Sequence, residues 1–301
     1  MRTVVYFAVL LLICMSMLAV ASAAQEHDHS GMTGDLGTVS FPTSCAPGVQ
    51  KQFERAVAML HSFWYEESEK TFREVATTDP SCAIAYWGVA MSVYHPLWYP
   101  PDAASLNKGS EALAKAKAAG AKTPRERDFI GALDKFYADS DKLDHKTRAA
   151  AYEAAMEQVS AHYPDDREAT IFYALALLGS ASPTDKTYSH QQKAGAMLEK
   201  IFAQQPNHPG VAHYIIHSYD YPSLASRALP AARAYAKIAP AAPHALHMPS
   251  HIFTRLGLWQ ESIESNLASE RAAKAYGERT HMKSAWGQQL HAMDYLEYAY
   301  L

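Results

Sequence analysis

The chain has 301 residues, and its 31 aspartates and glutamates outnumber its 27 lysines and arginines, which gives a formal net charge of −4 at pH 7. A mildly acidic chain lacks the basic stripe that binds the phosphate backbone, so we expect no nucleic-acid partner. Histidine is the unusual residue: the chain has 15, and eight of them lie between residues 208 and 291.

The first residues have the features of a secretory signal peptide. Arg2 supplies a positive charge, Val4 to Val20 is almost wholly apolar, and Ala21-Ser22-Ala23 is a small-residue cleavage site. We therefore predict a signal peptide over residues 1–23 and a mature protein that is periplasmic or secreted. The single charge and the cleavage site favour removal of the segment, so we expect no stable membrane anchor after cleavage.

Residues 24–44 are polar and have no helical periodicity, which predicts a flexible lead-in to a helical domain over residues 45–301. Cys45 and Cys82 remain after the signal peptide is removed, and an even cysteine count in an exported protein favours a disulfide between them. The alternative, a pair of thiolate metal ligands, is less favourable because 36 residues intervene and there is no C-x-x-C motif.

Proline marks regular breaks in the helical pattern. Four dipeptides each follow the end of a predicted helix: Asp79-Pro80, Tyr163-Pro164, Gln205-Pro206 and Ala239-Pro240. Strand signals are nearly absent. The pattern predicts an all-α fold of about six helix pairs and a final unpaired helix, near 46–61/64–78, 82–95/102–119, 124–138/145–162, 165–179/185–204, 209–219/222–238, 243–256/259–275 and 284–301.

Several features recur with an offset of 34 residues, the period of the tetratricopeptide repeat, a helix–turn–helix unit. Pro206 and Pro240 are separated by this offset. The small and aromatic residues of Ala83-Ile84-Ala85-Tyr86-Trp87-Gly88 resemble the opening of such a repeat, and Tyr219, Ala228 and Pro240 fill the corresponding positions of another. The chain thus resembles the tetratricopeptide repeat superfamily, and this resemblance implies a right-handed α-solenoid with a concave groove.

The chain also resembles a family of exported bacterial proteins of this repeat class. The segments that carry this resemblance are Leu60-His61-Ser62-Phe63-Trp64, Ala85-Tyr86-Trp87-Gly88, His208-Pro209-Gly210-Val211-Ala212-His213-Tyr214 and His244-Ala245-Leu246-His247-Met248-Pro249-Ser250-His251-Ile252-Phe253. That family has no settled biochemical activity, so the resemblance implies the fold and not the chemistry. The chain stops inside an apolar helical pattern without a polar capping element. Either the sequence is truncated, which we favour, or the last helix packs on another subunit.

Two His-x-x-x-His pairs lie one repeat apart. They are His213/His217 and His247/His251, with His244 and His291 as candidate additional ligands. A three-residue gap places both histidines of a pair on one helix face, about 5–6 Å apart at Cβ. The repeat resemblance implies that these positions line the groove, where four imidazoles would point into one small volume. Because imidazole binds copper and zinc well, the leading hypothesis is a scaffold that binds one of these transition metals.

Two alternatives stay open. The same groove could hold a peptide segment of a protein partner without any metal, or the histidines could make structural hydrogen bonds only. A metalloenzyme is a third and weaker hypothesis, because neither pair contains the glutamate that acts as general base in the H-E-x-x-H motif. The sequence therefore favours a binding protein over an enzyme.

Pro249 lies between the two histidines of the second pair. A proline inside a helix removes a backbone hydrogen bond and kinks or breaks the helix. Pro249 therefore either bends this helix or marks its start. In the second case His247 would lie in the preceding turn, and the helical geometry of the His247/His251 pair would be lost.

Overall fold

The computed structural model describes residues 35–97 and 99–301. The predicted signal peptide and residues 24–34 of the predicted lead-in lie outside this part of the chain. Across the described residues the regular structure is helical and contains no strand, which confirms the all-α prediction. None of the described helices combines the length and the apolar character needed to cross a membrane.

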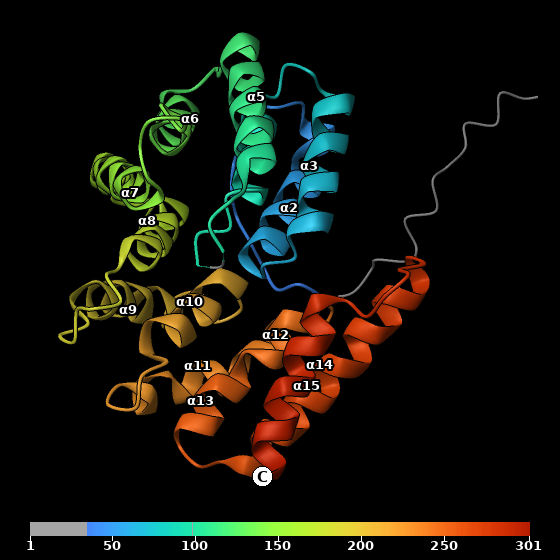
Figure 1. The fold of residues 1–301 in the computed structure, drawn as a ribbon. Helices are drawn as coiled ribbons and strands as arrows, with labels where there is room; N and C mark the ends of the chain where they lie inside the picture. Colours follow the sequence, from blue (N-terminus) through green and yellow to red (C-terminus); the bar gives the residue numbers. More distant parts are fainter. Residues whose placement is uncertain (1–34, 98) are drawn as a thin grey trace, which may run out of the picture. The chain divides into compact units, whose positions relative to one another are not determined.

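The helices follow one another at short intervals along the chain (Figure 1). They are η2 (Pro47–Val49), α2 (Gln50–His61), α3 (Tyr65–Thr78), α4 (Ala83–Ser92), α5 (Ala103–Ala119), α6 (Pro124–Tyr137), α7 (His145–His162), α8 (Arg167–Ser180), α9 (Ser189–Phe202), α10 (Pro209–Tyr219), α11 (Ala225–Ile238), α12 (Pro243–His247), α13 (Pro249–Arg255), α14 (Trp259–Arg279) and α15 (Gly287–Tyr300). Their bounds agree with the predicted pairs to within a few residues, because the proline-containing breaks are visible in the sequence.

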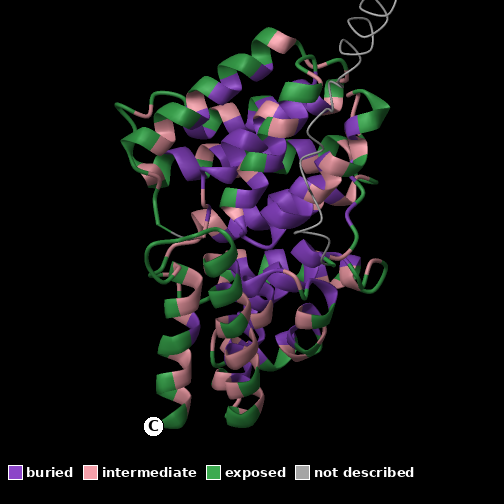
Figure 2. Cartoon of the chain, turned by 90° about the vertical axis from the view of Figure 1, so that its right-hand side faces the viewer, coloured by how far each residue is buried: buried purple, intermediate pink, exposed green. Residues whose placement is uncertain are grey.

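Each helix packs on the next one along the chain, as expected for an all-α solenoid. The first helices of successive pairs also touch: α4 contacts α2 and α6, and α10 contacts α8. In addition α10 contacts α2, so this row of first helices curves until the fifth pair meets the first (Figure 1). The buried residues gather between the helices, whereas α15 carries mainly half-buried and exposed residues (Figure 2).

The space inside the curved row is filled by the chain itself. Phe41 is fully buried there, in the segment that precedes the first helix. Its ring centroid lies 5.3 Å from those of Phe53 and Phe129, 5.6 Å from that of Trp87 and 6.5 Å from that of Phe172. These four partners come from α2, α6, α4 and α8, so one side chain joins the first helices of four pairs.

Residues 35–44 therefore differ from the flexible lead-in that their composition predicted. Leu36 and Val39 are buried beside Phe41, and the Thr38 N–H donates to the carbonyl of Asn207 at 2.9 Å. The Ser44 hydroxyl donates to the Glu126 carboxylate at 2.6 Å. Three apolar side chains, Leu36, Val39 and Phe41, anchor this mostly polar segment. They fill the apolar interior that forms where the row of first helices closes on itself.

Replacing Phe41 with alanine is expected to lower the free energy of unfolding by about 3–5 kcal/mol, the usual effect of deleting a buried aromatic ring. Denaturant unfolding followed by circular dichroism measures this change. The matched control is Ser40→Ala, because Ser40 is exposed in the same segment. Equal stability of the two variants would show that residues 35–44 do not belong to the core.

The predicted disulfide between Cys45 and Cys82 is present. It joins the end of this segment to the residue before α4, so the thiolate alternative does not apply. The predicted final helix is also present as α15, which packs on α14 and contacts α12. This contact with α12 brings α15 to the histidine-rich end of the domain.

Candidate metal centre

Six histidines meet where the C-terminal helices come together. They are His213 and His217 on α10, His244 and His247 on α12, His251 on α13 and His291 on α15. The structure divides them into two groups, each with candidate ligand nitrogens within 4.8 Å of one another: the first triad, His213, His217 and His244, and the second triad, His247, His251 and His291.

This grouping corrects the expected single set of four. The sequence period places His213 and His247 at equivalent repeat positions, but the structure puts them in different triads. The short helix α12 supplies one histidine to each, so His244 joins the α10 pair while His247 joins His251. His244 and His291, predicted as additional ligands, are thus full members of their triads.

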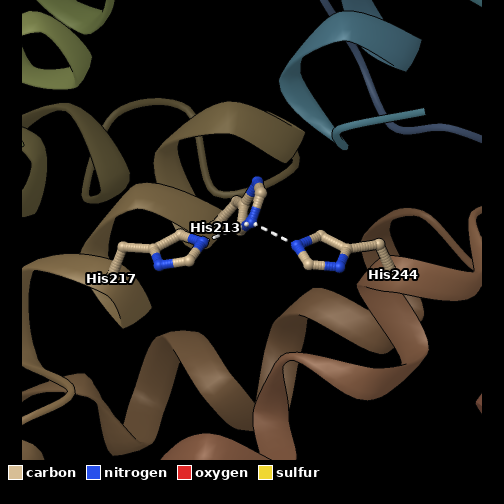
Figure 3. Close-up of side chains that lie close together, drawn as sticks. All are labelled: His213, His217 and His244. Carbon is tan, nitrogen blue, oxygen red and sulfur yellow. Dashed lines mark hydrogen bonds between the residues drawn. The ribbon is translucent and has the colours of Figure 1, made fainter. Parts of the chain in front are cut away.

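In the first triad, His213 lies between the other two rings (Figure 3). The Nε2 atom of His213 is 3.0 Å from Nε2 of His217 and 3.1 Å from Nε2 of His244. His213 and His244 are buried, whereas His217 is half-buried. The triad is therefore enclosed on one side and open on the side of His217.

The hydrogen bonds of the outer ring nitrogens fix which inner nitrogens carry lone pairs. Nδ1 of His213 is 2.6 Å from the backbone carbonyl of His61, which only accepts, so Nδ1 carries the proton and Nε2 a lone pair. Nδ1 of His244 likewise lies 3.2 Å from Oε1 of Gln288. In the tautomers in which both outer nitrogens donate, the Nε2 lone pairs of His213 and His244 face each other across 3.1 Å.

Facing lone pairs repel unless a proton or a cation lies between them. Nitrogens bind these metal ions at about 2.0–2.1 Å. Two nitrogens on one ion therefore lie about 2.9 Å apart when the nitrogen–metal–nitrogen angle is about 90°, and about 3.3–3.4 Å apart when that angle is tetrahedral. The distances of 3.0 and 3.1 Å in the first triad fall within that range. The distances from His213 to its two neighbours are therefore compatible with a shared ion.

The second triad also contains a close pair of ring nitrogens. Nε2 of His247 is 2.9 Å from Nε2 of His251, and the His247 and His291 ring centroids are 4.5 Å apart. Nδ1 of His247 lies 2.6 Å from Oδ1 of Asn266. That oxygen accepts, because the Asn266 amide nitrogen donates to the carbonyl of Ser262, so Nε2 of His247 also carries a lone pair.

Asp220 orients the other ring of the second pair. Its carboxylate accepts from Nδ1 of His251 at 2.8 Å and from Nε of Arg255 at 2.9 Å. A carboxylate behind a metal-binding histidine is a common arrangement, since it fixes the ring and raises the basicity of the other nitrogen. The hydroxyl of Tyr295 lies 3.1 Å from the same Nδ1. Nε2 of His251 is thereby directed toward His247.

A proton could also lie between the facing Nε2 atoms, but burial disfavours the charged imidazolium that would result. Burial, assisted by the neighbouring imidazoles, lowers the pKa of His213, His244 and His247 well below the ordinary 6.5. Burial and the nearby His251 lower the pKa of His217 to about 3. At neutral pH these rings are therefore neutral, the state in which imidazole binds metals.

Pro249 does not destroy the second pair. It is the first residue of α13, and the chain leaves α12 through Met248, whose φ of −53° and ψ of −34° remain helical. Proline takes the first helical position readily, because the missing N–H has no helical partner there. His247 and His251 therefore stay on one face although two helices carry them, and their Nε2 atoms are 2.9 Å apart.

A third cluster was missed by the sequence interpretation. Glu168 is buried between His61 and His208, accepting from Nε2 of His61 at 3.0 Å and from Nε2 of His208 at 2.8 Å. The outer nitrogens are occupied as well, by the Tyr214 hydroxyl at 2.9 Å and the Val211 N–H at 3.3 Å. The ligand atoms of this cluster also lie close enough together to hold an ion. Because all four ring nitrogens have hydrogen-bond partners outside their own pair of rings, we interpret this cluster as a structural element.

Little in the sequence points to that cluster. His208 precedes Pro209 at a helix start, a capping position that pattern analysis can find. Nothing links Glu168 to His61, more than a hundred residues away, until α2, α8 and α10 are packed together. The cluster also bears on the first triad, since the carbonyl of His61 holds His213.

A scan of the chain against protein-family models finds no match, and a search of curated proteins finds none either. The resemblances to the tetratricopeptide repeat superfamily and to its exported bacterial members therefore stay predictions that rest on the segments quoted above. The chemistry of the site follows from its own geometry.

Proposed function

We propose that this protein is an exported tetratricopeptide-type scaffold that binds transition-metal ions in its two histidine triads. The observation that carries the proposal is the pairing of inner ring nitrogens. In each triad two Nε2 atoms lie at a distance that two ligands of one metal ion would have. The Nδ1 atoms of the same rings contact hydrogen-bond acceptors. A purely structural histidine pair would turn one N–H toward the other ring's lone pair.

Copper and zinc fit these ligand sets best. Each triad presents imidazole nitrogens and no hard carboxylate ligand among its members, which disfavours magnesium and calcium. The affinity order of divalent ions favours copper over zinc at nitrogen sites. Zinc with three histidines would keep a fourth position for water.

The metal-free peptide scaffold is less well supported. His213, His244 and His247 are 0–2% exposed, so a peptide could not reach them without moving helices. The space inside the curved helix row is also occupied, by Phe41 and its neighbours. A peptide that binds elsewhere on the surface would not explain the histidines.

Export and the repeat type belong to the same proposal. The Cys45–Cys82 disulfide supports an oxidising compartment, such as the periplasm or the cell exterior, because cytosolic thiols are kept reduced. The consecutive helix pairs and the offset of 34 residues support the tetratricopeptide type.

Metal analysis tests the proposal. The protein is expressed with its own N-terminal segment, purified without chelator and analysed for metals, and is then depleted and titrated with copper or zinc. Saturation with the preferred ion is expected to raise the melting temperature by about 5–10 °C, since a ligand at 100 times its Kd adds about 2.7 kcal/mol.

Two variants make the test specific. His213→Ala/His247→Ala removes the buried member of each pair and is expected to lose the bound metal and the thermal shift. His162→Ala replaces an exposed histidine on α7 and should keep both. If the unaltered protein carries no stoichiometric metal and neither ion changes its melting temperature, the proposed function is wrong.

A further inference from the structure

The two triads are close neighbours. His244 and His247 are three residues apart on α12, and their ring centroids are 6.1 Å apart. On the other side, the ring centroids of His217 and His251 are 6.5 Å apart. Ions held by the two triads would therefore be close neighbours.

Each triad leaves its ion short of ligands. Three imidazoles occupy three positions, whereas four-coordinate zinc and copper need at least one more. The two triads themselves consist of histidine alone. The remaining position at each ion would therefore be open to a ligand from solution.

The charge of such a centre is also unbalanced. Two divalent ions would be held by six neutral rings. The carboxylate behind His251 belongs to Asp220, which is already paired with the guanidinium of Arg255 at 2.9 Å. An anion from solution that binds between the ions would fill both open positions and reduce their mutual repulsion.

The exposure of the triads shows which anions can enter. His213, His244 and His247 form a buried floor, while His217, His251 and His291 are only half-buried. Tyr295 stands beside the half-buried edge, with its ring centroid 4.7 Å from that of His251. The partial exposure of these three rings favours a small anion over a polymer or a large metabolite.

We propose that the two triads form one dinuclear centre that binds a small bridging anion of the size of hydroxide, azide or a halide. This inference rests on the proposed metal binding and adds three claims to it: two ions per chain, adjacent ions, and a shared exogenous ligand.

Copper and azide provide the test. The metal-depleted full chain is loaded with Cu(II), its copper content is measured, and azide is titrated while absorbance and electron paramagnetic resonance are recorded. We expect two coppers per chain and an azide-to-copper charge-transfer band. We also expect loss of more than half of the integrated resonance signal, because one bridging anion couples the two unpaired spins.

Single-triad variants are the matched controls. His217→Ala should disable the first triad and His291→Ala the second, and both side chains are half-buried, so the fold should tolerate their removal. Each variant is expected to hold one copper whose resonance signal persists in azide. Azide should bind each variant at least about tenfold more weakly than the unaltered protein, because a second contact from the same centre is lost.

The possible outcomes separate the two claims. A protein that takes up no copper contradicts the proposed function itself. One copper per chain overturns the dinuclear centre while metal binding stands. Two coppers that keep their full resonance signal in azide, with an azide affinity equal to that of the single-triad variants, mean two independent sites and also overturn it.

Discussion

The metal-free protein is expected to lose its stability steeply as the pH falls below about 6.5. The cause is a set of neutral histidines at buried positions or, for His217, at a half-buried one; the set is His61, His213, His217, His244 and His247. Burial lowers the pKa of each below the ordinary value of 6.5, to about 3 for His217. In the unfolded chain the same rings regain a pKa near 6.5 and bind protons more readily.

The direction follows from proton linkage. Above about pH 6.5 these rings are neutral in both states, so the full stability is present. Below that pH the rings become protonated in the unfolded chain but stay neutral in the folded protein. Each such ring then lowers the free energy of unfolding by about 1.4 kcal/mol per pH unit. Two rings alone would remove about 3 kcal/mol per unit from a typical total of about 5–15 kcal/mol. We therefore expect unfolding within about two units.

Denaturant unfolding at a series of pH values between 8 and 4, in the presence of a chelator, measures this dependence. His217→Gln should make the slope shallower by about 1.4 kcal/mol per pH unit. His281→Gln, which changes an exposed side chain, should leave the slope unaltered. A stability that is flat from pH 7 to pH 5 would contradict the prediction.

Metal binding adds a second arm to that experiment. An ion in a triad competes with protons for the same nitrogens, so saturating copper or zinc should move the unfolding midpoint to lower pH. If the midpoint does not move, the histidines are buried for structural reasons alone. The pH series therefore distinguishes the metal proposal from the structural alternative.

The sequence was informative wherever its signals are local. Proline-containing breaks gave the helix bounds, and the offset of 34 residues identified His213 and His247 as equivalent positions. The division into triads depends on how α12 is oriented between α10 and α13. The sequence period does not predict that orientation. The burial of Phe41 was not predicted for a related reason. The polar residues around it in the sequence indicate a flexible segment, and the space that Phe41 fills exists only once the first helices have packed into a closed row.

Glu168 shows what long-range packing adds, and its removal is expected to be among the most destabilising single changes. Burial alone would raise the pKa of this carboxyl, but His208 and His61 together lower it below its ordinary value, so it is charged in the core. Glu168→Ala leaves two buried imidazole N–H groups without an acceptor. Each buried donor left without an acceptor costs about 1–3 kcal/mol, so the two together are expected to cost about 2–6 kcal/mol.

Glu168→Gln is the graded variant. Its amide offers one oxygen to one histidine but turns an NH₂ donor toward the other, so we expect a loss of about 1–3 kcal/mol. Glu157→Ala is the control: this exposed glutamate also accepts hydrogen bonds, from Tyr173 and Lys193, and its removal should cost about 1 kcal/mol or less. Denaturant midpoints rank the three variants.

The copper content of the Glu168→Gln variant tests whether His61 and His208 bind an ion. His61 and His208 have both ring nitrogens hydrogen-bonded, so we assign them no ion and expect the variant, if folded, to bind as much copper as the unaltered protein. A decrease by one ion per chain would place a metal between Glu168 and its histidines. An unchanged content would mean that the histidines of the two triads, and not the core network around Glu168, hold the ions.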